Sequence, residues 1–91
     1  LVPDGSRSEW RDASGTVQLA EVHPHVEWFG NPVTQLEQAA GVRVAFLTRL
    51  GEGLIPDEST VLQDGDLIHV MVRDEDISKV EVTLGNPPEA H

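Results

Sequence analysis

The chain contains no cysteine among its 91 residues and few basic residues, with six Lys and Arg against 16 Asp and Glu. Without cysteine, disulfides and thiolate metal sites are excluded, and this composition is typical of a reducing compartment. The formal net charge of −10 disfavours nucleic acid and anionic lipid surfaces as partners, because their phosphates would be repelled. No apolar run approaches the ~18 residues of a membrane span, so direct membrane insertion is not expected.

Sequence motifs of catalysis are also missing. The segment Gly51-Glu52-Gly53 lacks the remaining glycine and the Lys-Ser/Thr of a phosphate-binding loop, and it is expected to join two strands. No GxGxxG motif is present, so neither NAD nor ATP is assigned as a cofactor. No Ser or Cys nucleophile motif accompanies a histidine. The sequence therefore predicts a domain that is not an enzyme.

The length of the chain predicts one domain and a partner copy. A chain of this size buries only about 60% of its unfolded surface, and its core alone supplies roughly 3–5 kcal/mol. Self-association is the common remedy, so we expect a homodimer. The chain does not begin with Met, which favours a fragment of something longer.

Both ends of the sequence look peripheral. Residues 1–15 are polar and are expected to form a linker or arm from an absent upstream domain. Trp10 is expected to pack on the domain or on a neighbour, because tryptophan is mostly buried. Residues 85–91 are expected to fray.

The first half of the domain predicts a strand and a helix. Thr16–His23 is rich in β-formers, but its alternation slips, so either a bulge is present or both faces are covered. A helix is predicted over 32–40, with Asn31 as N-cap, Pro32 at the first helical position and Gly41 at the C-terminus.

Three strands are predicted next. In residues 42–50, Val42, Val44 and Phe46 are expected to share one face, with Arg43 and Arg49 on the other. The turn at 51–53 leads to a short strand, Leu54-Ile55, that ends at Pro56.

A Gly-Asp turn, in which Gly65 is expected to have positive φ, opens the strand 67–73. Ile77, Val80 and Leu84 then fit a helix, yet Val80, Val82 and Leu84 also alternate as in a strand. For residues 80–84, helix and strand both stay open. The fold class is α+β, in the order β-α-β-β-β-α, with a mostly antiparallel sheet and a helix packed on one face.

Candidate metal ligands are few. His23 and His25 could form half of a metal site, completed by Glu21 and Glu27, although two loop histidines are the simpler interpretation. His69 lies mid-strand and is expected to be partly buried and hydrogen-bonded rather than catalytic. Arg43 is expected to pair with a nearby acid. For Arg49 two possibilities stay open, either such an ion pair or an anion held by its guanidinium fork.

The order of several elements resembles the C-terminal regulatory domain of the Trk-type potassium-uptake regulators, called TrkA-C or RCK-C. The matching pieces, over residues 16–84, are Val17–Val22, Gly30, Val33, Leu36, Val42–Arg49, Gly51, Pro56, Leu62, Gly65 and Asp66. The resemblance implies a cytoplasmic, ligand-sensing and dimerising module that regulates a potassium channel or transporter in the membrane. It also implies cyclic di-AMP or a divalent cation as effector, with Arg49 at the dinucleotide contact.

Other interpretations remain beside this one. The first is a pure homodimerisation module without a ligand. The second is a small metal-dependent enzyme that uses His23, His25 and Glu21. Because the chain is so acidic, a divalent cation held by Asp57, Glu58 or Asp64 competes with an anionic effector.

Overall fold

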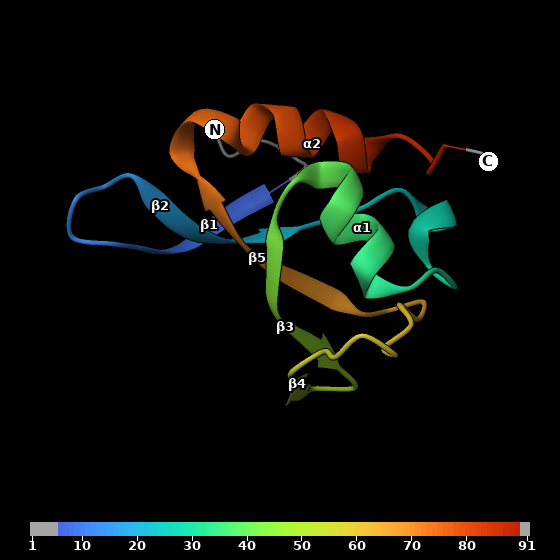
Figure 1. Ribbon diagram of the computed structural model, residues 1–91. Helices are drawn as coiled ribbons and strands as arrows, with labels where there is room; N and C mark the ends of the chain where they lie inside the picture. Colours follow the sequence, from blue (N-terminus) through green and yellow to red (C-terminus); the bar gives the residue numbers. More distant parts are fainter. Residues whose placement is uncertain (1–5, 90–91) are drawn as a thin grey trace.

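A computed structural model of the chain describes residues 6–89. In this range the elements are β1 (Ser6–Arg11), β2 (Val17–Val22), α1 (Val33–Ala40), β3 (Arg43–Arg49), β4 (Glu52–Leu54), β5 (Leu67–Arg73) and α2 (Ile77–Gly85). The 3-10 turns η1 (Val26–Trp28) and η2 (Asp74–Asp76) precede the two helices. The strands form one antiparallel sheet in the order β1-β2-β5-β3-β4, and both helices lie on one side of it (Figure 1).

The predicted α+β class is confirmed, but the sheet contains a strand that the sequence did not predict. This strand, β1, is an edge strand that pairs with β2, and only Ser6 of its six residues is buried. An edge strand that packs so little against the core needs no apolar alternation, and the sequence pattern therefore missed it. The arm expected over residues 1–15 thus joins the sheet from Ser6 onward, while residues 1–5 lie outside the described part.

The hairpin between β1 and β2 is closed by Asp12. Its carboxylate accepts hydrogen bonds from the backbone N–H groups of Ser14, Thr16 and Val17. The hydrogen bonds from the Ser14 hydroxyl and the Val17 backbone are the main causes that lower the pKa of Asp12 to about 2. The slip in the apolar pattern of β2 reflects partial cover on both faces, while the bulge lies in β1, between Ser8 and Trp10.

The hydrophobic core lies between the sheet and the helices. Its buried members are Ala20, Val22, Trp28, Val33, Leu36, Val42, Val44, Leu47, Leu62, Ile68, Val70, Val72, Val80 and Leu84. Alternate residues of β2 and β5 supply the sheet side of this core, which is the period-two pattern of a strand with one face on the core. In β5 these residues are Ile68, Val70 and Val72.

The N-terminus of α1 differs from the prediction. The helix begins at Val33, its N-cap position is Pro32 in an extended conformation, and no side chain caps it. Asn31 instead donates from Nδ2 to the carbonyls of Glu27 and Trp28, at 2.9 and 3.3 Å, and so closes η1. The prediction of Asn31 as the cap of α1 was wrong because Pro32 is held in a β-bridge to Val61, one residue before the helix.

The C-terminus of α1 agrees with the prediction. Gly41, at φ +68°, is left-handed and ends the helix as expected.

A β-bulge in β3 changes which side chains face the core. The pairing with β5 shifts register between Val44 and Phe46, so Val44 and Leu47 are buried in the core whereas Phe46 is not. The expected placement of Phe46 beside Val44 was therefore wrong. Arg43 pairs with Met71, and Thr48 pairs with Leu67, on the same face of β5. Arg49, the neighbour of Thr48, thus points to the opposite face from Arg43, which also contradicts the sequence prediction.

Residues 77–85 are helical, which decides between the two possibilities left open for 80–84. Val80 and Leu84 face the core, and Val82 is 67% exposed. The tail expected to fray is held at its start, because the Trp28 indole donates to the Asn86 carbonyl at 2.7 Å. Residues 90–91 lie outside the described part. Among the described helices, none has the length and apolar character needed to cross a membrane.

Candidate functional site on the open face of the sheet

The sheet has one face that the helices do not cover, which we call the open face. Strand pairing arranges its residues in rows: Arg7, Glu21, His69 and Phe46 form one row, and Trp10, Leu19, Met71 and Arg43 form the next. Trp10 is 52% exposed and Leu67, near one end of β5, is 41% exposed. Of the two expectations for Trp10, packing on its own domain is therefore met only in part, because about half of the residue stays exposed. The open face combines apolar side chains with a polar centre.

His69 forms the polar centre of the open face. Its Nδ1 lies 2.5 Å from Oε1 of Glu9, and its Nε2 lies 3.0 Å from Oγ1 of Thr48. Its ring stacks on Phe46 with a centroid separation of 4.0 Å. With 4% of its surface exposed, His69 is the buried, hydrogen-bonded strand histidine that the sequence predicted.

The predicted half-site of His23 and His25 is divided in the structure. Nε2 of His23 lies 2.8 Å from Oε2 of Glu21, whereas Nδ1 of His25 accepts a hydrogen bond from the Glu27 backbone N–H and caps η1. The hydrogen bond with His23 lowers the pKa of Glu21 despite the opposing effect of burial, and Arg7 adds to the lowering. Glu21 thus belongs to the open face together with Glu9 and His69.

Arg49 is bound by an internal carboxylate. Its Nε and Nη2 donate to the two oxygens of Asp66 at 2.9 and 2.8 Å, and Nη2 also donates to the Val61 carbonyl at 3.0 Å. Burial raises the pKa of Asp66, but the hydrogen bonds from Arg49 and from the Gln63 backbone outweigh it and hold this pKa below its usual value. This bidentate pair fixes the loop before β5 to the end of β3. For Arg43, no ion pair within 4 Å is found among residues 6–89.

The acids proposed as oxygen ligands for a divalent cation lie in local turns. Asp57 accepts hydrogen bonds from the hydroxyl and the backbone of Ser59 and from the Thr60 hydroxyl, and these lower its pKa. Glu58 and Asp64 are exposed. Within the described residues, the group that brings three candidate metal ligands together is Glu9, Glu21 and His69 instead.

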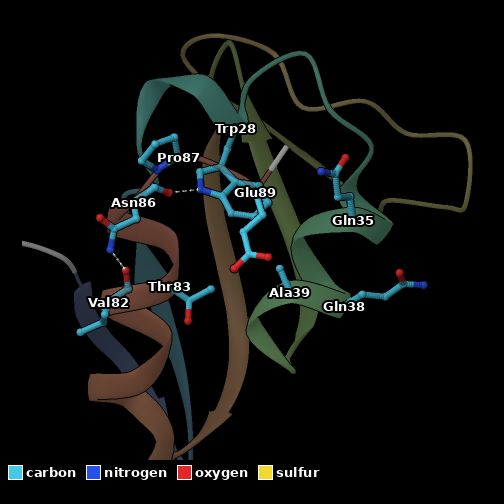
Figure 2. Close-up of a pocket in the computed structure, with 9 residues that line it drawn as sticks. All are labelled: Trp28, Gln35, Gln38, Ala39, Val82, Thr83, Asn86, Pro87 and Glu89. Atoms are coloured by element: carbon cyan, nitrogen blue, oxygen red, sulfur yellow. Dashed lines mark hydrogen bonds between the residues drawn. The ribbon is translucent and has the colours of Figure 1, made fainter. Parts of the chain in front are cut away.

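A groove of about 640 Å³ lies between α1, α2 and the C-terminal tail. Figure 2 shows Trp28 and Asn86 joined by a hydrogen bond at its wall, with Gln35 and Gln38 on α1 and Thr83 on α2. Its polar side chains are three amides, the Thr83 hydroxyl and the Trp28 indole, with the single carboxylate of Glu89. The groove therefore offers no charged constellation for catalysis.

The sequence did not predict Glu9, Thr48 and Phe46 as the residues that surround His69 on the open face. Glu9 lay in the segment expected to be an arm, and the bulge that turns Phe46 onto the open face leaves no mark in the apolar pattern. Thr48 lies beside His69 only because of the pairing between β3 and β5, which the sequence pattern does not reveal.

Solved structures define the class of fold. The chain superposes on the GsuK RCK domain with a TM-score of 0.74 over 93% of this chain and 19% of that one, at 22% identity. At this identity the likeness concerns the fold alone. The chain therefore has the α+β fold of the GsuK RCK domain.

The sequence comparisons identify the family. The TrkA-C domain model matches residues 17–85, and the chain belongs to this family. It is 51% identical over 89 residues, 98% of its length, to the Trk system potassium uptake protein TrkA of Streptomyces coelicolor, and it spans 40% of that relative. A putative transport protein of Pasteurella multocida is 39% identical over 51 residues, which cover 56% of this chain and 9% of the relative.

Proposed function

We propose that the chain is a non-enzymatic regulatory module of a Trk-type potassium-uptake system. The observation that carries this proposal is the TrkA-C match over residues 17–85, together with 51% identity to a protein named for potassium uptake. The module acts in the cytoplasm, and it is peripheral to the membrane through a channel or transporter subunit that the longer protein contacts.

A chimera tests this role. The matching segment of the Streptomyces relative is replaced by this chain, and potassium uptake is measured in cells that lack the relative's own gene. The chimera should restore uptake at low external potassium, whereas the relative without the segment should not. If the chimera accumulates normally but behaves like the deletion, the proposed role is wrong.

The regulatory module works as a homodimer through the open face. Support comes from the apolar side chains that this face leaves uncovered, above all Trp10 and Leu67. A second copy placed against the open face would bury them and supply the apolar area that a small core lacks. A symmetric dimer also places equivalent residues of both copies around its two-fold axis, where an effector binds between the copies.

Sedimentation of wild type and two variants tests the dimer. Trp10→Ser removes the largest exposed side chain of the open face and should weaken association about tenfold or more. Val26→Ser is the matched control, because Val26 is 64% exposed but lies in η1, away from the sheet. A wild-type monomer at micromolar concentration, or equal weakening by both variants, would contradict the assembly.

The effector is cyclic di-AMP or a divalent cation, and Arg49 is the anion contact. Support for Arg49 is limited to its remaining donor, since Nη1 has no hydrogen-bond partner among the described residues and 27% of the side chain is exposed. The bidentate pair with Asp66 favours the alternative of a bare dimerisation module, in which the arginine is structural.

Calorimetry separates these alternatives. Wild type is titrated with cyclic di-AMP, calcium and magnesium, and the dinucleotide titration is repeated on Arg49→Lys. The lysine retains the charge beside Asp66 but loses the fork, so dinucleotide affinity should fall while the fold persists. Unchanged affinity would remove Arg49 from the site, and no heat with any titrant would favour the bare dimerisation module.

A further inference from the structure

We propose that Glu9, Glu21 and His69 form a binding site for a divalent cation of the zinc type on the open face. These residues come from the three neighbouring strands β1, β2 and β5, and their ligand atoms all lie within 4.8 Å of one another. Ligands about 2.0 Å from a tetrahedral ion are roughly 3.3 Å apart. Small side-chain movements are therefore enough to close the site.

The backbone brings the three residues together at defined positions. Glu21 and His69 are directly paired across β2 and β5, so their side chains leave the same face side by side. Glu9 is the extra residue of the bulge between Ser8 and Trp10. The bulge turns its carboxylate inward over the sheet, where it reaches His69.

Groups behind the ligands already orient them as outer-shell groups do in metal sites. The Thr48 hydroxyl lies 3.0 Å from Nε2 of His69, so Nδ1 is the ring nitrogen on the side of the Glu9 carboxylate. Stacking on Phe46 fixes the ring plane. His23 holds Oε2 of Glu21 at 2.8 Å, so this carboxylate also has a defined orientation.

The ligand set selects the kind of ion. Calcium and magnesium prefer oxygen ligands alone, whereas one imidazole and two carboxylates suit zinc and similar ions. Three protein ligands leave a fourth position for water or for a group from a partner. The net charge of −10 favours cation entry, while Arg7, 3.5 Å from Oε1 of Glu21, opposes it.

The metal would replace the contact between His69 and Glu9. In the metal-free site Nδ1 of His69 lies 2.5 Å from Oε1 of Glu9. The incoming ion takes the lone pair of Nδ1, and a proton held there moves to Nε2 or to solvent. The proposal does not depend on the regulatory role, because the site is complete within one copy of the chain.

Calorimetry with zinc chloride, on protein first treated with a chelator, tests the site. Wild type should bind one zinc per chain. Magnesium at the same concentration should not bind there. The absence of zinc binding, or equal affinity for magnesium, would overturn the proposal.

Three variants locate the bound ion. Glu9→Gln changes an exposed residue and His69→Gln a buried one, and each should lower zinc affinity at least tenfold. His25→Gln is the control and should bind as wild type does. If His69→Gln fails to fold, Glu9→Gln still decides the question. Unchanged affinity in Glu9→Gln, or lost affinity in His25→Gln, would place the zinc elsewhere and refute the site.

Discussion

At the scale of single residues, a few side chains fix the loops between the strands. They supply hydrogen bonds to backbone groups that have no partner in the sheet. Asp66 does this for the segment before β5, since its carboxylate binds Arg49 with both oxygens and accepts the Gln63 backbone N–H. Asp12 does the same for the β1–β2 turn. Gly65 allows the turn before β5, because its φ of +92° lies in a region that L side chains rarely adopt.

Asp66 makes stability depend on pH. Its pKa is lower in the folded than in the unfolded chain, so its stabilisation is fully present above the unfolded pKa of about 4 and is lost as the pH falls through the folded value. Asp66→Asn should therefore cost about 2–4 kcal/mol at pH 7, because it leaves Arg49 without its partner. At about pH 3 the difference should shrink. Urea denaturation at both pH values, with Asp64→Asn as exposed control, measures it; an equal loss at both would contradict the argument.

A second prediction concerns the cost in stability of replacing Gly65, which has a left-handed backbone. A Cβ at this position would meet no atom within 4 Å, so any cost of Gly65→Val comes from the left-handed backbone and should be about 1–3 kcal/mol. Gly85→Ala is the control, since it too has open space but is the last residue of α2, where alanine is better than glycine by at most about 1 kcal/mol. Chemical denaturation of both variants should show opposite signs. Two equal changes would mean that backbone conformation is not the cause.

At the scale of elements, the β3–β4 hairpin contains an unfavourable residue. Arg49 pairs with Glu52, which leaves a two-residue turn of Leu50 and Gly51. Both have positive φ, at 53° and 81°, and Leu50 is 98% exposed. A two-residue hairpin turn of this kind favours Asn-Gly, because asparagine tolerates the left-handed region better than leucine.

Leu50→Asn should therefore stabilise the domain by about 0.5–1 kcal/mol. The leucine side chain contributes no burial that would be lost, so the gain in backbone preference is unopposed. Thermal unfolding measures the effect, with Leu50→Ala as a variant that removes the same apolar surface without the left-handed preference. A destabilised Leu50→Asn would show that the turn has another conformation.

The helical state of α2 also has a direct test. In a helix Val80 faces the core and Val82 faces solvent, whereas in a strand both would share one face. Val80 is 1% exposed and Val82 is 67% exposed. Val80→Ala should cost about 1–3 kcal/mol through lost burial, and Val82→Ala should change the stability by less than about 0.5 kcal/mol. Similar losses in both variants would be the result expected of a strand.

At the scale of the whole molecule, charge and apolar surface act against each other. Two copies that meet through the open face would each bring a net charge of −10, while the side chains of Trp10 and Leu67 would favour their contact. The repulsion is long-range and weakened by salt, whereas burial of apolar surface does not depend on low ionic strength.

The association of two copies should therefore tighten as salt is raised. Between about 0.01 M and 0.15 M ionic strength the Debye length falls from roughly 30 to 8 Å, and the dissociation constant from sedimentation equilibrium should fall with it. Trp10→Ser should retain the salt dependence at weaker overall affinity. A dimer that dissociates as salt increases would instead indicate an interface made by ion pairs.

The sequence by itself determined the α+β class, the left-handed glycines at 41 and 65 and the family. These follow from local chemistry, since alternation, backbone preference and motif order are properties of neighbouring residues. Tertiary structure decided the rest. The bulges of β1 and β3 moved Glu9 and Phe46 onto the open face, Asp66 took the fork of Arg49, and Pro32 shifted the start of α1. Each of these outcomes depends on a partner far away in the chain, because pairing register and side-chain contacts across a sheet are set only when the strands meet.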